Sequence, residues 1–171
     1  MNPSAQAYIE ALQLSPHPEG GFYKETYRSE CTVQPQPATS TSLVRLSSVR
    51  AASTGIYFLL EHCNFSAFHR IASDEMWHFY AGDALEVLEL HETGKLVTTH
   101  LGTDLAKGET FQHVVKANTW FASRVAQGGA YALVGCTVAP GFDFSDFQLA
   151  DRVELSRQYP SHREVIATLT R

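Results

Sequence analysis

The stretch SAFHRIASDEMWHFYAG, residues 66–82, combines a strand-like alternation with a His and a Glu six positions apart, residue types that bind protons or metals. The tripeptide ASD in its middle indicates a turn between two strands. Alternation places Ala67 and His69 on one face of the first strand, and Glu75 and Trp77 on the matching face of the second. We therefore expect His69 and Glu75 to converge inside a sandwich or barrel.

The segments around this stretch predict the same class of fold. Eight short runs rich in β-branched and aromatic residues lie at 53–61, 65–71, 75–81, 84–90, 95–101, 110–116, 119–125 and 130–138. Glycine-containing segments punctuate them, and no helical periodicity intervenes. Short strands at such regular spacing predict an all-β antiparallel sandwich or barrel.

The N-terminal residues predict a helix, a turn and a strand. Asn2 caps a helix that begins at Pro3, and the helix is expected to end before Pro16. SPHPEGG at 15–21 follows as a rigid turn in which Gly20 and Gly21 provide positive φ angles or a close backbone approach. FYKETYR at 22–28 alternates as a half-exposed strand, with Arg28 on the face opposite Tyr23, and 29–40 is predicted as a loop.

The C-terminal residues return to helical patterns. Asp151, with Glu154 three positions later, predicts a short helix over 152–158. Ser161 and Glu164 form a capping box behind a proline, and an apolar stripe follows it. We predict one or two C-terminal helices within a single domain, residues 1–171.

Composition and charge exclude several classes of partner. The 171 residues carry a net charge of −5 without any run of Lys or Arg, which argues against nucleic acid and anionic membranes as partners. No apolar run approaches the roughly 20 residues that cross a bilayer, and the first residues lack the pattern of a secretory signal. The three cysteines are widely spaced and form no CxxC motif. We expect a cytoplasmic protein with reduced thiols.

Residues 66–82 resemble the first motif of the cupin superfamily, in which His-x-His is followed by a Glu and then a Gly. His69, Glu75 and Gly82 match the spacing, but Ile71 occupies the position of the second His. The second cupin motif falls on KANTWF at 116–121, where Phe121 replaces the last His. Two of the four usual ligands are therefore absent, and the remaining two are too few to hold a metal tightly.

The resemblance extends to an uncharacterised family, cupin-5, through four segments that occur in the same order and spacing. These are PHPEGGFYKETYRS at 16–29, FHRIASDEMWHFYAGDALEVL at 68–88, NTWFAS at 118–123 and APGFDFSDFQL at 139–149. Membership implies a double-stranded β-helix, the cupin jelly roll, assembled as a homodimer. The family also resembles the metal-independent epimerases of the dTDP-rhamnose pathway in fold.

By that resemblance, His69 is the expected base and Glu75 its carboxylate partner. The acid would be a tyrosine, with Tyr23, Tyr27, Tyr57 and Tyr131 left as alternatives. Trp77 and Phe121 are expected in the pocket wall, as core packing or as ligand contacts, and Glu19 near the barrel mouth.

Three functions stay open on the sequence alone. The first is a metal-independent isomerase or epimerase that acts on a small, polar, carbohydrate-like molecule. The second is a non-catalytic binding or sensing module that uses the same pocket, which the apolar residues Ile71 and Phe121 favour. The third is a metal-dependent dioxygenase or isomerase. The missing ligands argue against it, although His113 is available as an additional ligand from a neighbouring strand.

Overall fold

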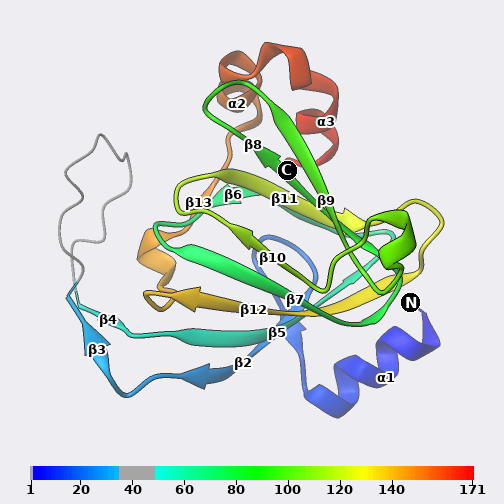
Figure 1. Cartoon of the computed structure of the whole chain (residues 1–171), viewed down its shortest axis with the longest axis vertical. Coiled ribbons are helices and arrows are strands. Elements are labelled where there is room, and N and C mark those ends of the chain that lie inside the picture. The colour runs from blue at the N-terminus through cyan, green and yellow to red at the C-terminus, as the bar shows by residue number, and fades with distance from the viewer. Residues whose placement is uncertain (1, 35–48) are drawn as a thin grey trace.

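Two antiparallel β-sheets pack face to face in the computed structural model, which describes residues 2–34 and 49–171 (Figure 1). The first sheet has the order β1-β2-β5-β12-β7-β10 and the second β13-β6-β11-β8-β9, with a small pair β3-β4 at one side. The strands are β1 (Ser15–Pro16), β2 (Phe22–Arg28), β3 (Thr32–Val33), β4 (Arg50–Ala51), β5 (Thr54–Glu61), β6 (Phe65–Arg70), β7 (Asp74–Gly82), β8 (Leu85–Leu90), β9 (Leu96–Leu101), β10 (Gln112–Val115), β11 (Trp120–Val125), β12 (Tyr131–Ala139) and β13 (Gln148–Leu149). Each of the eight predicted runs forms a strand, which confirms the all-β class.

The main core lies between the two sheets, as alternation requires. Trp77, Phe58 and Phe121 are its largest members, each 1% exposed, and the rings of Trp77 and Phe121 meet edge to face with centroids 6.2 Å apart. Strands β6, β8 and β11 are buried on their second face as well, because the C-terminal helices cover it. Phe68 therefore contacts the helices, while its neighbour His69 points between the sheets.

The terminal helices are confirmed. In α1 (Pro3–Leu12), the Asn2 side chain accepts hydrogen bonds from the first turn, and Ala5 is buried against β5 and β12. In α2 (Arg152–Gln158), Asp151 Oδ1 accepts from the amide of Glu154 at 2.8 Å. None of the helices in the described residues has the length and apolar character needed to cross a membrane.

The predicted capping box at Ser161 is wrong. Pro160–His162 form a 3₁₀ turn, and α3 (Arg163–Thr168) begins only after it, without a side-chain cap. The preceding helix ends at Gln158, so the chain turns directly from α2 into the 3₁₀ segment. The tight turn displaces the start of α3 beyond the position at which Ser161 acts as a cap.

The HPEGG turn fixes the chain between β1 and β2. The amide of His17 donates to Gly21 O and the amide of Gly20 donates to His17 O, both at 3.0 Å. Gly20 has a φ of 116°, and a Cβ there would lie 2.1 Å from the carbonyl oxygen of Phe65. Both the positive φ and the close backbone approach predicted for this glycine are confirmed.

A β-bulge in β2 corrects the predicted position of Arg28. Tyr23 pairs with Phe58 and Glu25 with Ile56, but the register then shifts, and Arg28 pairs with Thr54. The extra residue reverses the alternation, so Arg28 joins Tyr23 and Glu25 on the face that lines the barrel. Of the predicted loop at 29–40, residues 35–40 lie outside the described part of the chain.

Replacing Gly20 by Ala tests the HPEGG turn. The added Cβ meets backbone on one side, and the positive φ strains any L side chain, so we expect a loss of about 3 kcal/mol or more in the free energy of unfolding. Gly94→Ala is the matched control, because Gly94 has a φ of 83° and nothing lies within 4 Å of a Cβ there. The control should lose about 1 kcal/mol. Urea denaturation measures both, and equal losses would contradict the steric role of Gly20.

Candidate functional site

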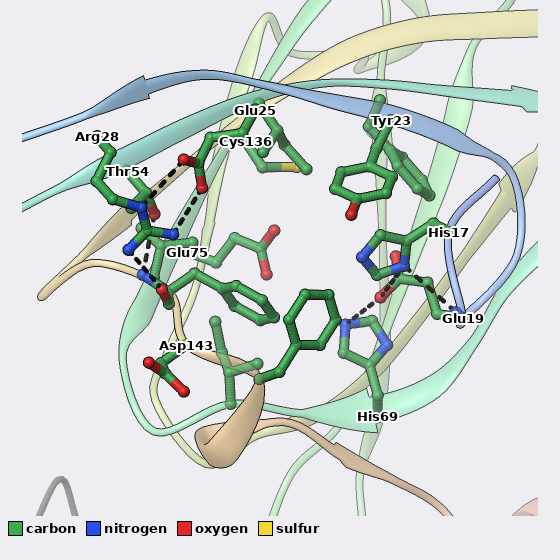
Figure 2. A pocket seen from close by; sticks show the side chains of 16 residues that line it. His17, Glu19, Tyr23, Glu25, Arg28, Thr54, His69, Glu75, Cys136 and Asp143 are labelled. Carbon is green, nitrogen blue, oxygen red and sulfur yellow. Dashed lines mark hydrogen bonds and ion pairs between the residues drawn. The ribbon is translucent and has the colours of Figure 1, made fainter. Parts of the chain in front are cut away.

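A cavity of about 310 Å³ opens between the two sheets, at the end of the barrel that the HPEGG turn borders. Its polar lining comes from the turn, from strands β2, β5, β6, β7 and β12, and from the segment after β12 (Figure 2). The lining residues are His17, Glu19, Tyr23, Glu25, Arg28, Thr54, Ile56, Phe58, His69, Ile71, Glu75, Cys136, Val138, Phe142, Asp143 and Phe144.

His69 projects from β6 and is 2% exposed. Its Nδ1 lies 2.7 Å from the carbonyl oxygen of Ala67, and a carbonyl only accepts, so Nδ1 carries a proton. The ring packs on Phe121, with centroids 4.1 Å apart. Burial lowers the pKa of His69, and a neutral ring in this tautomer has its lone pair on Nε2.

The carboxylate that contacts His69 is Glu19, and not Glu75 as the sequence suggested. Glu19 Oε2 lies 3.2 Å from His69 Nε2, and Oε1 accepts from the hydroxyl of Ser66 at 2.9 Å. Burial raises the pKa of Glu19, while His17 and Ser66 oppose that rise less strongly. Because Nε2 and a carboxylate oxygen attract only with a proton between them, His69 and Glu19 share one proton and act as a pair.

Glu75 reaches the cavity from β7 on the opposite sheet, and its carboxyl group points into the cavity (Figure 2). Burial raises the pKa of Glu75 to about 7, with His69 opposing and Glu19 adding to that rise. The Cys136 thiol donates a hydrogen bond to it, and burial raises the pKa of this thiol well above its ordinary value, so Cys136 stays protonated. Near neutral pH, Glu75 therefore exists in both protonation states.

His17 lies in the HPEGG turn, beside the pair of His69 and Glu19. The amide of Glu19 donates to His17 Nδ1 at 3.3 Å, so Nδ1 accepts and the proton of the neutral ring is on Nε2. Burial lowers the pKa of His17, which favours this neutral form. Its ring meets Tyr23 edge to face with centroids 4.5 Å apart, and both side chains border the cavity.

Arg28 and two phenylalanines form the outer part of the cavity. The Arg28 guanidinium donates to both carboxylate oxygens of Glu25, at 3.0 and 2.6 Å, and to the carbonyl oxygen of Phe142 at 3.2 Å. Phe142 and Phe144 meet edge to face at 5.0 Å, and Phe144 is exposed at the rim.

Four of the residues selected from the sequence meet in this cavity: Glu19, Tyr23, His69 and Glu75. Trp77 and Phe121 lie behind the wall in the core and do not line it. Tyr57 lies on the other face of β5, packed towards α1 and edge to face with Tyr80, so it does not line this cavity as predicted.

Sequence reasoning missed His17, Arg28, Cys136 and Phe144 as lining residues. His17 had a signal, because it belongs to the HPEGG segment that also contains Glu19. Phe144 belongs to APGFDF, which marked the family without indicating a place in the fold. For Arg28 the sequence carried no such signal, because the bulge that turns its side chain inward cannot be recognised from the alternation of residues in β2.

In this chain, the residues at the metal-ligand positions of a typical cupin do not fit a metal. Ile71 lines the cavity beside His69, and the ring of Phe121 occupies the place of the last His ligand. His113, which the sequence offered as an additional ligand, is paired with Glu89 instead. Across residues 2–34 and 49–171, no cluster of three or more His, Cys, Asp or Glu side chains has a geometry that would hold a metal ion.

The pKa of Glu75 makes stability depend on pH. Between its ordinary value of 4.5 and about 7, the folded protein holds a proton that the unfolded chain has released. The stability from this group is therefore fully present below pH 4.5 and lost as the pH rises through 7. Glu75→Gln does not titrate, so its free energy of unfolding relative to wild type should rise by on the order of 3 kcal/mol from pH 4 to pH 8. Urea denaturation at both pH values measures this, with Glu164→Gln on the exposed face of α3 as control; a difference independent of pH would contradict a buried, protonated Glu75.

Comparison with known proteins places this architecture in a family. Residues 6–150 match the family model described as Cupin superfamily (DUF985). A solved protein of Shewanella oneidensis is 41% identical with a TM-score of 0.84, covering 98% of this chain and 97% of its own. A hypothetical protein from Leishmania major is 34% identical with a TM-score of 0.88, covering 97% and 98%.

More distant relatives are consistent with this family and with its fold. An uncharacterized protein of Saccharomyces cerevisiae is 32% identical over 148 residues, 84% of this chain and 73% of its own length. Oxalate decarboxylase from Bacillus subtilis shares only the fold, at 11% identity and a TM-score of 0.53 over 90% of this chain and 36% of the enzyme. Fold, motif spacing and family match together show that, within the cupin superfamily, the chain belongs to the Cupin_5 family, for which no activity is established.

Proposed function

We propose that the chain binds a small polar, carbohydrate-like molecule in the cavity and isomerises or epimerises it by proton transfer, without a metal. One observation carries this proposal: two groups that exchange protons face one cavity from opposite sheets. Glu75 comes from β7, and the pair of His69 and Glu19 lies on the side of β6. A proton removed on one face of a ligand is replaced from the other, which is what an epimerisation requires.

The proton balance of the step closes with these groups and a relay between them. The Glu75 carboxylate takes the proton from a carbon next to a carbonyl, and the C–H electrons form the double bond of an enolate. The pair of His69 and Glu19 then returns its shared proton to the opposite face, and Glu75 passes its own proton to the pair through solvent or Tyr23. In the reverse direction His69 is the base, the role expected from the resemblance to the epimerases.

The size and lining of the cavity suit a molecule of this kind. A volume of about 310 Å³ lies at the lower end of the range for small-molecule pockets, which fits one sugar-sized ligand. Polar groups converge from several elements while Phe58 and Ile56 supply apolar contact. A ligand that enters displaces water and strengthens the interactions among the buried groups.

A non-catalytic binding module is the second candidate, and one contact favours it. Glu19 engages Nε2 of His69 at 3.2 Å, the same nitrogen that a base must present to a substrate. If this contact persists when a ligand is bound, the pair serves to hold the ligand and not to transfer protons.

Hydrogen exchange separates the two candidates. Wild-type protein is incubated in deuterated water with nucleotide sugars, sugar acids and keto acids that stabilise it in a thermal-shift screen. We expect deuterium at the carbon next to the carbonyl, detected by NMR, and a rate lowered about 10²- to 10⁴-fold in His69→Gln and Glu75→Gln. Glu164→Gln, remote on α3, should exchange at the wild-type rate. A ligand that binds wild type without exchange supports the binding module and contradicts the isomerase.

We also propose that two chains assemble as a homodimer along the edge of β2. Among the described residues, β1 pairs only with Tyr23 and Phe22, so the rest of this edge faces no other strand. Tyr27 lies on that edge and is 55% exposed. Open strand edges are sites at which chains pair.

Sedimentation velocity tests the dimer. We expect wild type at twice the mass of one chain and Tyr27→Glu shifted towards the monomer, because a charge in the paired edge must be desolvated. Val153→Glu introduces the same charge at an exposed apolar residue on α2, 77% exposed, and should stay dimeric. A dimer unaffected by Tyr27→Glu would place the interface elsewhere.

A further inference from the structure

Carboxyl groups outnumber cationic groups among the residues that line the cavity. Within residues 2–34 and 49–171, the lining contains four carboxyl groups, those of Glu19, Glu25, Glu75 and Asp143, and one guanidinium, that of Arg28. The guanidinium of Arg28 is already hydrogen-bonded, since it donates to both carboxylate oxygens of Glu25 and to the carbonyl oxygen of Phe142. An anionic group of a ligand would therefore meet several carboxyl groups and, in the described part of the lining, a guanidinium whose charge Glu25 already compensates.

Aromatic rings form much of the rest of the wall. Tyr23 and Phe58 lie on the side of β2 and β5, and Phe142 and Phe144 close the cavity from the segment after β12. The faces of aromatic rings carry partial negative charge and attract cations, most strongly where water is excluded. The rings therefore favour the same sign of ligand charge as the carboxylates do.

Glu75 is the carboxyl group best placed to bind a cation. It is 7% exposed and points into the cavity (Figure 2). Its hydrogen-bond partner is the Cys136 thiol, a weak donor, whereas Glu19 is bound by Ser66 and His69, and Glu25 by Arg28. A buried carboxylate with so little compensation gains more from an added cation than a carboxylate that is already paired.

We propose that the natural ligand carries a protonated amine, which Glu75 binds among the aromatic rings, and that phosphorylated or nucleotide-bearing molecules are excluded from this site. This specifies the substrate class of the cavity to which the proposed function refers. An ammonium that donates to Glu75 also keeps it ionised, the form in which it accepts a proton.

Binding of an amine should depend on pH with a defined sign. A bound cation favours ionised Glu75, and burial holds the pKa of this group at about 7 in the free protein. Below that pH the group must release a proton for binding, so affinity should rise about tenfold per unit up to pH 7 and then level. The titratable and charged groups that face Glu75 are His17 and Glu19 on the turn, Tyr23, Glu25 and Arg28 on β2, His69 on β6, Cys136 on β12 and Asp143 after it.

Matched ligands that differ in one end group test the proposal. Glucamine, glucitol and gluconate share one carbon skeleton and end in an ammonium, a hydroxyl and a carboxylate. Ethanolamine, ethylene glycol and glycolate form a shorter set. Isothermal titration calorimetry should show at least one amine binding about tenfold more tightly than its alcohol, and each carboxylate more weakly than its alcohol. Preference for the amine should be greater at pH 8 than at pH 6.

Variants identify the group responsible. Glu75→Gln should abolish both the preference for the amine and its pH dependence, with folding checked by thermal unfolding. Glu164→Gln removes the same charge from the exposed face of α3 and should retain both. If neither amine binds more tightly than its alcohol, or if Glu75→Gln keeps the preference, the proposal is wrong.

These outcomes are independent of hydrogen exchange. Amine preference without deuterium incorporation leaves the amine site intact and removes the proposed isomerisation. Deuterium incorporation into a sugar phosphate or nucleotide sugar does the reverse.

Discussion

The carboxyl group of Glu19, held inside the barrel by a turn at its end, is the constraint on which the rest of the site depends. Its backbone carbonyl accepts from the amide of Ala67, and its side chain contacts Ser66 and His69, all on β6. Gly20 lets the chain approach β6 so closely that a Cβ would collide with Phe65 O. The side chain of Arg171 donates to the same carbonyl at 3.0 Å, so a residue far along the chain also contacts this corner of the barrel.

From this constraint follows the chemistry of the cavity. Glu19 and His69 compensate each other within the apolar surroundings of Phe121, so the pair is stable where a single charge would not be. Glu75 faces them from the other sheet with little compensation, which keeps its pKa near 7. A metal in a typical cupin neutralises such carboxylates. Here Ile71 and Phe121 stand at two of the metal-ligand positions, and the cavity contains His69, Glu19 and Glu75 as groups that can exchange protons.

The fold was largely predictable because it rests on local patterns. The eight central strands coincide with short runs rich in β-branched and aromatic residues, and Asn2 and Asp151 cap the helices that their spacing predicts. The errors occur where a single residue changes the geometry. The bulge in β2 turns Arg28 into the cavity, and the 3₁₀ turn after α2 displaces the start of α3 from Ser161. Neither changes the composition of its segment, so neither shows in a periodic pattern.

By itself, the sequence determined the class of fold, the first motif with His69 and Glu75, and the loss of two metal ligands, because spacing and residue type suffice for each. Only the tertiary structure decided which carboxylate His69 contacts, that Tyr23 and not Tyr57 faces the cavity, and that Arg28 is neutralised by Glu25. Glu19 is fifty residues from His69 along the chain, and a contact over that separation depends on how the turn docks against β6. Pairing between distant segments is a property of the packed sheets, and no local pattern records it.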